Sequence, residues 1–183
     1  MIINNLIYRI SHTLFYLRFI RDNYGQDEHF WTHMLDNPKK TAWQGYSFEQ
    51  LVKNHIEQVK RALGIASVLT QQSSWFVTKR TLDAYSDDNE EITRNEINGA
   101  QIDLLIDRRD RSINVCEVKF CGGEFIIDKD YSLKLRNKIT AFKVATNTPK
   151  ALIPTMITTF GVKRNQYSGN VKQEVVLDDL FAI

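Results

Sequence analysis

Three ionisable residues in two short apolar segments carry the chemistry that this sequence offers. Asp103 lies in residues 101–106, and Glu117 and Lys119 lie in residues 113–120. Two carboxylates held close together repel each other, and burying them costs more, unless a cation lies between them. Mg²⁺ binds through one or two carboxylates together with water and substrate phosphates. A lysine beside such an ion holds the attacking water or neutralises charge on phosphorus, so these residue types indicate metal-dependent phosphodiester cleavage.

A β-hairpin is the element that would bring the three residues together. Both segments are rich in strand-forming residues, and the polar link at 107–112 predicts a turn. A turn centred on Asp110 pairs position 103 with position 117, and alternate side chains of a strand share a face. The alternative is a solvated face with three ordinary surface residues. Against it, other residues of the same parity favour burial, namely Leu105, Ile113 and Val115.

At these residues the sequence resembles the PD-(D/E)XK nuclease superfamily. Its signature is an acidic residue near the end of one strand and (D/E)-X-K on the next, here Gln101-Ile102-Asp103 and Glu117-Val118-Lys119. The resemblance implies that Asp103, Glu117 and the backbone carbonyl of Val118 bind Mg²⁺ or Mn²⁺. It also implies that Lys119 positions or deprotonates water, and that Glu49, from a helix before the hairpin, adds a ligand or orients metal-bound water. The implied fold is α/β, a restriction-endonuclease-like mixed central sheet flanked by helices, with a short N-terminal extension.

A narrower resemblance, over residues 41–183, is to the C-terminal nuclease-like domain of prokaryotic AAA-type ATPases of the "ATP-binding protein" kind. Its pieces lie at residues 45–49, 99–108, 113–120 and 158–161. It implies nucleic acid as substrate, DNA in preference to RNA, and an ATPase module from the same full-length polypeptide as partner. Such domains can lose activity. The alternative function is therefore a catalytically silent module that docks on an ATPase or binds nucleic acid without cutting it.

The sequence departs from the family pattern at two places. No proline precedes Asp103, and the helix expected after the hairpin lacks the glutamine that some relatives carry, where Lys138 would substitute. Lys138 lies away from the apolar stripe of that helix and is also a candidate phosphate contact. Arg108 and Arg109 lie at the predicted turn of the hairpin. They either contact phosphates next to the metal site or form a solvent-exposed loop.

Residues 1–40 are predicted to be a strand–helix segment separate from the nuclease-like domain at 41–183. The strand is expected at residues 5–10 and the helix at 14–20, with a linker at 36–40. Two interpretations stay open, the remnant of an ATPase junction and an ordinary β–α element. The chain contains no phosphate-binding loop of the G-x-x-x-x-G-K-[ST] type, so it is not itself the ATPase.

The helix that carries Glu49 is expected to begin at Ser47. Ser47 and Gln50 have capping-box spacing, apolar residues recur at helical spacing to Leu63, and Gly64 ends the pattern. Glu49 then lies in the first turn, where a carboxylate is also favoured by the helix dipole alone.

The remaining elements complete a mixed sheet with helices packed on it. A strand is expected over residues 75–85 with Trp75, Phe76 and Val77 as core candidates. A helix follows at 131–146 with a buried stripe of Leu135, Ile139 and Phe142, and two later strands at 152–160 and 173–177.

The bulk composition sets limits on function. The 183 residues are 43% hydrophobic and 25% charged, as in soluble globular proteins, and the net charge of +2 does not by itself indicate nucleic-acid binding. The apolar stretch at 14–20 is too short to cross a bilayer, so a cytoplasmic protein without a membrane partner is expected. Cys116 is expected to be a buried thiol, and pairing of two copies to cut two strands is compatible with the sequence.

Overall fold

The structure, a computed structural model, describes residues 11–23, 25, 27–84 and 97–182. The predicted strand at residues 5–10 lies outside this range. The chain forms two compact units, Met1–Asn54 and His55–Ile183. Within the described residues, none of the helices combines the length and the apolar character needed to cross a membrane.

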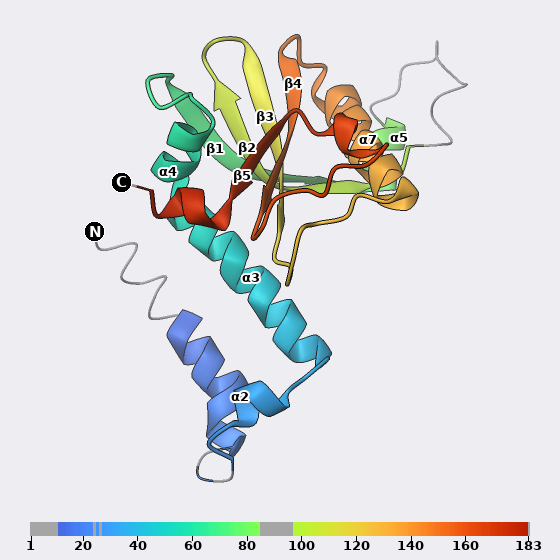
Figure 1. Cartoon of the computed structure of the whole chain (residues 1–183). Coiled ribbons are helices and arrows are strands. Elements are labelled where there is room, and N and C mark those ends of the chain that lie inside the picture. The colour runs from blue at the N-terminus through green and yellow to red at the C-terminus, as the bar shows by residue number, and fades with distance from the viewer. Residues whose placement is uncertain (1–10, 24, 26, 85–96, 183) are drawn as a thin grey trace. The chain divides into compact units, whose positions relative to one another are not determined.

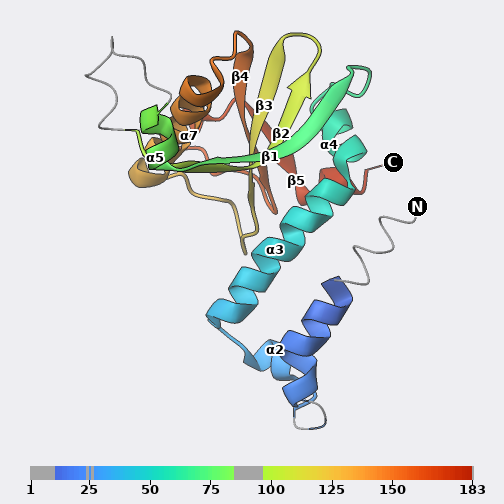
Figure 2. The ribbon, with the colours of Figure 1, turned by 180° about the vertical axis from the view of Figure 1, so that it is seen from behind.

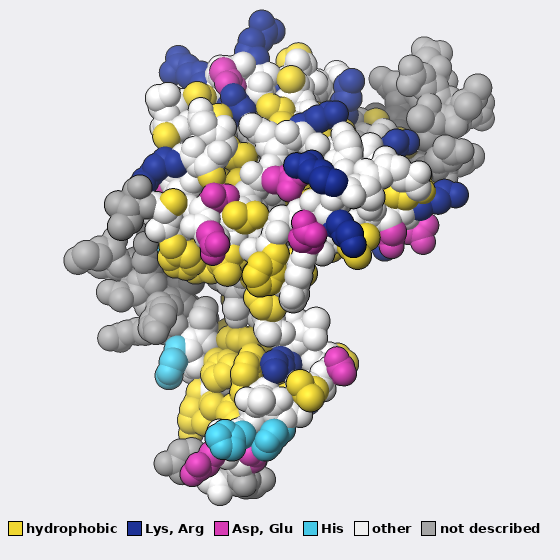
Figure 3. Space-filling view, viewed as in Figure 1, with side chains coloured by type: hydrophobic (Ala, Val, Ile, Leu, Met, Phe, Trp, Pro, Cys, Tyr) yellow, Lys and Arg dark blue, Asp and Glu magenta, His cyan; other side chains and the backbone are white. Residues whose placement is uncertain are grey.

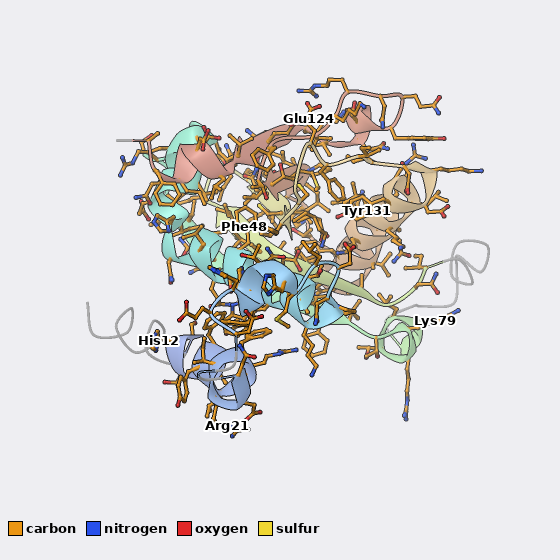
Figure 4. The ribbon with its side chains drawn as sticks, turned by 60° about the horizontal axis from the view of Figure 1, so that its bottom comes forward. His12, Arg21, Phe48, Lys79, Glu124 and Tyr131 are labelled. Carbon is orange, nitrogen blue, oxygen red and sulfur yellow. The ribbon has the colours of Figure 1, made fainter. Side chains whose placement is uncertain are left out.

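The N-terminal unit is helical. Residues 11–15 form a helix that continues into η1 (Tyr16–Ile20) and η2 (Arg21–Asn23). The separate helices α2 (Phe30–His33) and α3 (Pro38–Asn54) follow. Figure 4 labels His12 in the first helix and Arg21 at the start of η2. Aromatic rings from the first helix, α2 and α3 pack together, with the centroids of Phe15 lying 5.2 to 5.6 Å from those of Phe19, Trp31 and Trp43.

Helix α3 begins at Pro38 and not at Ser47, so the predicted start was wrong. Asn37 Oδ1 accepts a hydrogen bond from the Lys39 N–H at 2.9 Å and caps the helix. Proline fits the first helical position because the N–H that it lacks would have no partner there. The segment interpreted as a linker is therefore the start of a helix. Glu49 lies well inside α3, and the predicted boundary after residue 40 falls within this helix, whereas the two units divide after Asn54.

The C-terminal unit is built on a five-stranded sheet of order β1-β2-β3-β4-β5 (Figure 1). The strands are β1 (Thr70–Val77), β2 (Ala100–Arg108), β3 (Ser112–Lys119), β4 (Ala151–Thr158) and β5 (Gln173–Val176). The helices are α4 (Ile56–Ala62), α5 (Lys79–Ala84), α7 (Lys129–Thr146), η3 (Ser168–Asn170) and η4 (Leu177–Leu180). Figures 1 and 2 show α7 and α4 on opposite sides of the sheet.

The sheet is mixed. Strands β1, β2 and β3 pair antiparallel, whereas β3, β4 and β5 pair parallel, and α7 makes the crossover between β3 and β4. The prediction of an α/β fold with a mixed sheet flanked by helices is confirmed. The antiparallel part contains the hairpin that carries the candidate site, and the parallel crossover brings a helix over it.

Helix α7 begins and ends at clear local signals. The Asp128 side chain accepts a hydrogen bond from the Tyr131 N–H, and Asn147 adopts the left-handed conformation that ends the helix, with φ of 45°. Of its predicted apolar stripe, Leu135 and Phe142 are buried, and Ile139 is partly buried against the same core. Phe142 packs on sheet residues of β2 and β3, namely Ile102, Leu105, Ile113 and Val115. This packing fixes α7 against the face of the sheet on which the candidate site lies.

The strand predicted over residues 75–85 ends at Val77. The Thr78 hydroxyl accepts a hydrogen bond from the Thr81 N–H and starts α5, so the chain turns into a helix where a strand was expected. Phe76 was predicted to be in the core but is 76% exposed. Val77, on the other face of the strand, is buried as expected.

Candidate active site

The hairpin register agrees with the sequence prediction. Leu104 pairs with Cys116 and Asp107 with Ile113, which is the register of a turn centred on Asp110. Arg111 takes the left-handed conformation needed to close this turn, with φ of 67°. Continuing the same register places the two acidic positions opposite each other at the far end of the hairpin from the turn.

Asp103 lies in a β-bulge that the sequence did not predict. Ser73 pairs with Leu105, but Trp75 pairs with Ile102. Two residues of β2, Asp103 and Leu104, therefore lie opposite one residue of β1, Ser74. A bulge of this kind bends the strand and redirects a side chain. Here it turns Ile102 and Leu105 toward the same core cluster although their numbers differ in parity.

The three predicted side chains converge on one point. Lys119 Nζ lies 3.8 Å from Asp103 Oδ2 and 3.6 Å from Glu117 Oε2. The carboxylate side chains are 8% and 2% exposed, whereas that of Lys119 is 34% exposed. The arrangement is therefore a buried pair of carboxylates below an ammonium that solvent reaches.

The main chain of Val118 also lies at this point. Its N–H donates a hydrogen bond of 3.1 Å to Asp103 Oδ2. This bond holds the Asp103 carboxylate against the backbone of β3 at Val118, between Glu117 and Lys119.

Two residues of α7 complete the surroundings of Glu117. Lys138 Nζ lies 2.5 Å from Glu117 Oε1, and the Tyr131 hydroxyl donates to Glu117 Oε2 at 3.3 Å. Figure 4 labels Tyr131 on α7. Lys138 was expected away from the buried stripe, yet it reaches the site. Lys138 was predicted from the sequence as a substitute for the glutamine of some relatives, whereas Tyr131 was not predicted as a site residue. Its seven-residue spacing from Lys138 puts both on the face of α7 that carries Leu135, which is the sequence signal that would have identified it.

The electrostatics of the pair follow from burial. Burial raises the pKa of Glu117, the charge of Asp103 raises it further, and Lys138 and Lys119 oppose the rise. Burial and the adjacent charge of Glu117 also raise the pKa of the Tyr131 phenol, which keeps it protonated as a donor. Two carboxylates in this environment gain from any cation that approaches them.

We expect Glu117→Gln to stabilise the metal-free protein at neutral pH. The folded state raises the pKa of Glu117 above its ordinary value of 4.5, so the stability it contributes is greatest below that pH and is lost as pH rises through the raised pKa. Thermal denaturation in EDTA should therefore give similar Tm values for variant and wild type near about pH 4, and a variant Tm higher by a few degrees near about pH 7.

The control for this experiment is Glu57→Gln, which makes the same change at a 61% exposed side chain. Its difference from wild type gives the baseline for replacing an exposed glutamate in this unit. A Glu117→Gln protein that loses stability relative to wild type as pH rises would show that ionised Glu117 is favoured in the fold, contrary to this account.

Two pockets adjoin the site, and Lys138 lines both. The smaller, of 310 Å³, lies between α7 and strands β3 and β4 and is lined by Glu117 together with apolar residues that include Val115, Leu135 and Pro154. The larger, of 730 Å³, lies between the start of β2 and α7. Its basic and amide lining residues are Lys134, Arg136, Lys138, Asn98, Gln101 and Asn137.

The hairpin arginines do not lie next to the site. Of the two interpretations left open for them, the structure argues against phosphate contacts beside the metal site. Arg108 is five residues from Asp103 along β2, a separation of about 17 Å at the rise of an extended strand. Its guanidinium pairs with Asp110 and donates to Asn114 Oδ1 at 3.3 Å. Arg109 lies in the exposed turn, where its N–H donates to the Leu69 carbonyl. The antiparallel register that aligns the acidic residues necessarily puts the turn at the other end.

Glu49 belongs to the N-terminal unit, whereas the other candidate residues belong to the C-terminal unit. Within α3 its carboxylate lies 4.0 Å from Lys53 Nζ, one turn further along the helix. Its role as a ligand or a water-orienting group remains a prediction.

The donor set suits a hard divalent cation. Mg²⁺ and Mn²⁺ are held by one or two carboxylates, with water and substrate oxygens as further ligands, and Asp103 and Glu117 supply that number. Within the described part of the chain, no group of three or more His, Cys, Asp and Glu side chains is arranged to hold a metal ion. The site would therefore take an ion only with ligands from the main chain, water or substrate.

Comparisons with known proteins give no family. No protein-family model and no curated protein matches this sequence. Among solved structures, the chain is similar to AF1548, a protein of unknown function, with 13% sequence identity and a TM-score of 0.41. The match covers 71% of this chain and 64% of AF1548, so this chain spans less than two thirds of that protein's length.

Proposed function

We propose that this chain is a metal-dependent nuclease domain of the PD-(D/E)XK type that hydrolyses phosphodiester bonds in nucleic acid, DNA in preference to RNA. The observation that carries the proposal is the convergence of Asp103, Glu117 and Lys119. Two buried carboxylates from adjacent strands face an ammonium that reaches solvent. The order of elements, a hairpin with an acid and E-x-K followed by a helical crossover to a parallel strand, supports it.

Each residue has a distinct role in this mechanism. Asp103 and Glu117 would hold Mg²⁺ or Mn²⁺, with the backbone carbonyl of Val118 as a further ligand. When bound, the ion stabilises charge on the reacting phosphate and lowers the pKa of a coordinated water. Lys119 would hold the attacking water by hydrogen bonding and neutralise charge developing on the phosphate oxygens. Tyr131 orients Glu117 through its hydroxyl at 3.3 Å.

The larger pocket is the proposed path of the nucleic-acid backbone. Lys134, Arg136 and Lys138 line it, and Lys138 connects it to Glu117. On the face of the C-terminal unit seen in Figure 3, Lys and Arg side chains are interspersed with Asp and Glu. A local basic pocket beside the site, not a uniformly basic surface, would therefore contact the phosphates.

A second candidate function is a nuclease-fold module that binds nucleic acid, or an AAA-type ATPase, without cutting. One observation favours it: Lys119 and Lys138 already balance the charges of the two buried carboxylates. A site that is neutral without an ion has less need of one. Metal binding separates the two candidates, because a silent module has no reason to take the ion through Asp103 and Glu117.

We expect isothermal titration calorimetry to detect Mn²⁺ binding to the wild-type protein, and Asp103→Asn to weaken it by about 100-fold, because the variant removes a charged ligand. The matched control is Asp107→Asn, which makes the same change on the same strand at a residue that pairs with Lys150 near the turn. Equal Mn²⁺ affinity in wild type and Asp103→Asn, or no binding to wild type, would contradict the proposed function.

A further inference from the structure

The candidate site contains its own cations. Lys138 Nζ lies 2.5 Å from Glu117 Oε1, and Lys119 Nζ lies 3.6 Å from Glu117 Oε2 and 3.8 Å from Asp103 Oδ2. Two negative charges are thus matched by two positive charges, and Glu117 is only 2% exposed. Glu117, which makes the shortest of these ion pairs, is therefore also one of the two proposed metal ligands.

A divalent ion that enters this site upsets the balance. Two carboxylates, two ammonium groups and the ion together carry a net charge of +2 in a buried place, where charge repulsion is stronger than in water. The excess is relieved if one ammonium moves away and an anion arrives. A phosphodiester supplies one negative charge for each phosphate.

Of the two lysines, Lys138 is the one whose ammonium group can move from Glu117 into an adjacent pocket. It is carried by α7 and not by the hairpin, and it lines the larger pocket with Lys134 and Arg136 as well as the smaller pocket beside Glu117. Lys119, by contrast, lies between both carboxylates on the strand that carries one of them.

We propose that Lys138 is the internal counter-ion of Glu117 in the metal-free site, competes with the divalent ion for Glu117 Oε1, and on ion binding carries its charge into the larger pocket to meet a substrate phosphate. The inference rests on the proposed nuclease function and deepens it. Its consequence is that metal ion and nucleic acid bind cooperatively, each increasing the affinity for the other. In the absence of substrate, Lys138 keeps the site poorly loaded with metal.

The test is Mn²⁺ calorimetry on wild type and Lys138→Gln, each with and without a short phosphorothioate oligodeoxynucleotide that resists cleavage. In wild type the oligonucleotide should tighten Mn²⁺ binding about tenfold. Lys138→Gln should bind Mn²⁺ alone about tenfold tighter than wild type, because the competing cation is gone, and should lose most of the enhancement by the oligonucleotide. The matched control is Lys143→Gln, at an exposed position later on α7 that lines neither pocket, which should leave the affinity for Mn²⁺ alone unchanged.

The outcomes distinguish this inference from the function on which it rests. Mn²⁺ affinity for Lys138→Gln that is equal to or weaker than that of wild type overturns the counter-ion role, and the nuclease proposal stands if Asp103→Asn still weakens binding. Equal tightening of Mn²⁺ binding by Lys143→Gln and Lys138→Gln also overturns it, because the effect would then be one of general charge. Absence of Mn²⁺ binding in every variant overturns both proposals.

Discussion

Replacing Lys119 with alanine is expected to lower the rate of Mg²⁺-dependent DNA cleavage by about 10³-fold, the loss typical of removing a donor aimed at charge in a transition state. Lys119 is the exposed member of the site, with Nζ within 3.8 Å of both acidic side chains, so it is placed to meet water and phosphate. The measurement is the single-turnover rate of cleavage of a labelled DNA with Mg²⁺ or Mn²⁺. EDTA should abolish cleavage by the wild type.

The control for Lys119→Ala is Lys143→Ala, which removes the same charge at an exposed position of α7 that lines neither pocket. Circular dichroism of both variants would show that the fold is retained. Cleavage by Lys119→Ala at the wild-type rate would remove the catalytic assignment, whatever the metal affinity of the site.

Replacing Phe142 with alanine is expected to cost about 3–5 kcal/mol of the free energy of unfolding. Phe142 is 5% exposed, its ring lies edge-on to Trp75 with centroids 5.1 Å apart, and it packs in the cluster between α7 and the sheet. Truncation leaves a cavity at the contact that holds α7, and with it Lys138 and Tyr131, over the site. Urea denaturation followed by circular dichroism gives the value.

Phe76→Ala is the matched control, because it removes the same side chain from a position on β1 that is 76% exposed. Its cost should be within about 0.5 kcal/mol of zero. Similar costs for the two variants would mean that the α7–sheet cluster is not the main support of the C-terminal unit.

The geometry of the hairpin could be predicted from local sequence alone. Turn chemistry centred on Asp110 and the two-residue period of the strands are enough to align Asp103 with Glu117 and to put Lys119 beside them. Both strands and their link are contiguous in the chain, so a few short-range preferences determine the geometry. The helix at Leu135 and Phe142 was predictable for the same reason, from a repeating apolar spacing.

Errors occurred where one residue type has two local uses. Asn37 and Pro38 are equally typical of a linker and of the cap and first position of a helix. Which of the two forms depends on whether the residues that follow pack as a helix against another helix. Thr78 lies in an apparently continuous strand, yet its hydroxyl starts a helix. Neither alternative is distinguished by a pattern of alternation alone.

By itself the sequence determined the fold class and the convergence of three ionisable groups on one hairpin, because those contacts join residues that neighbouring strands bring together. Only the tertiary structure revealed the bulge at Asp103, the approach of Tyr131 to Glu117, and that Glu117 is the carboxylate with which Lys138 pairs. The height and rotation of α7 over the sheet depend on how Leu135 and Phe142 pack against strands far away in the sequence. A shift of one helical position would have left Glu117 without its ammonium partner, and no local preference sets that position.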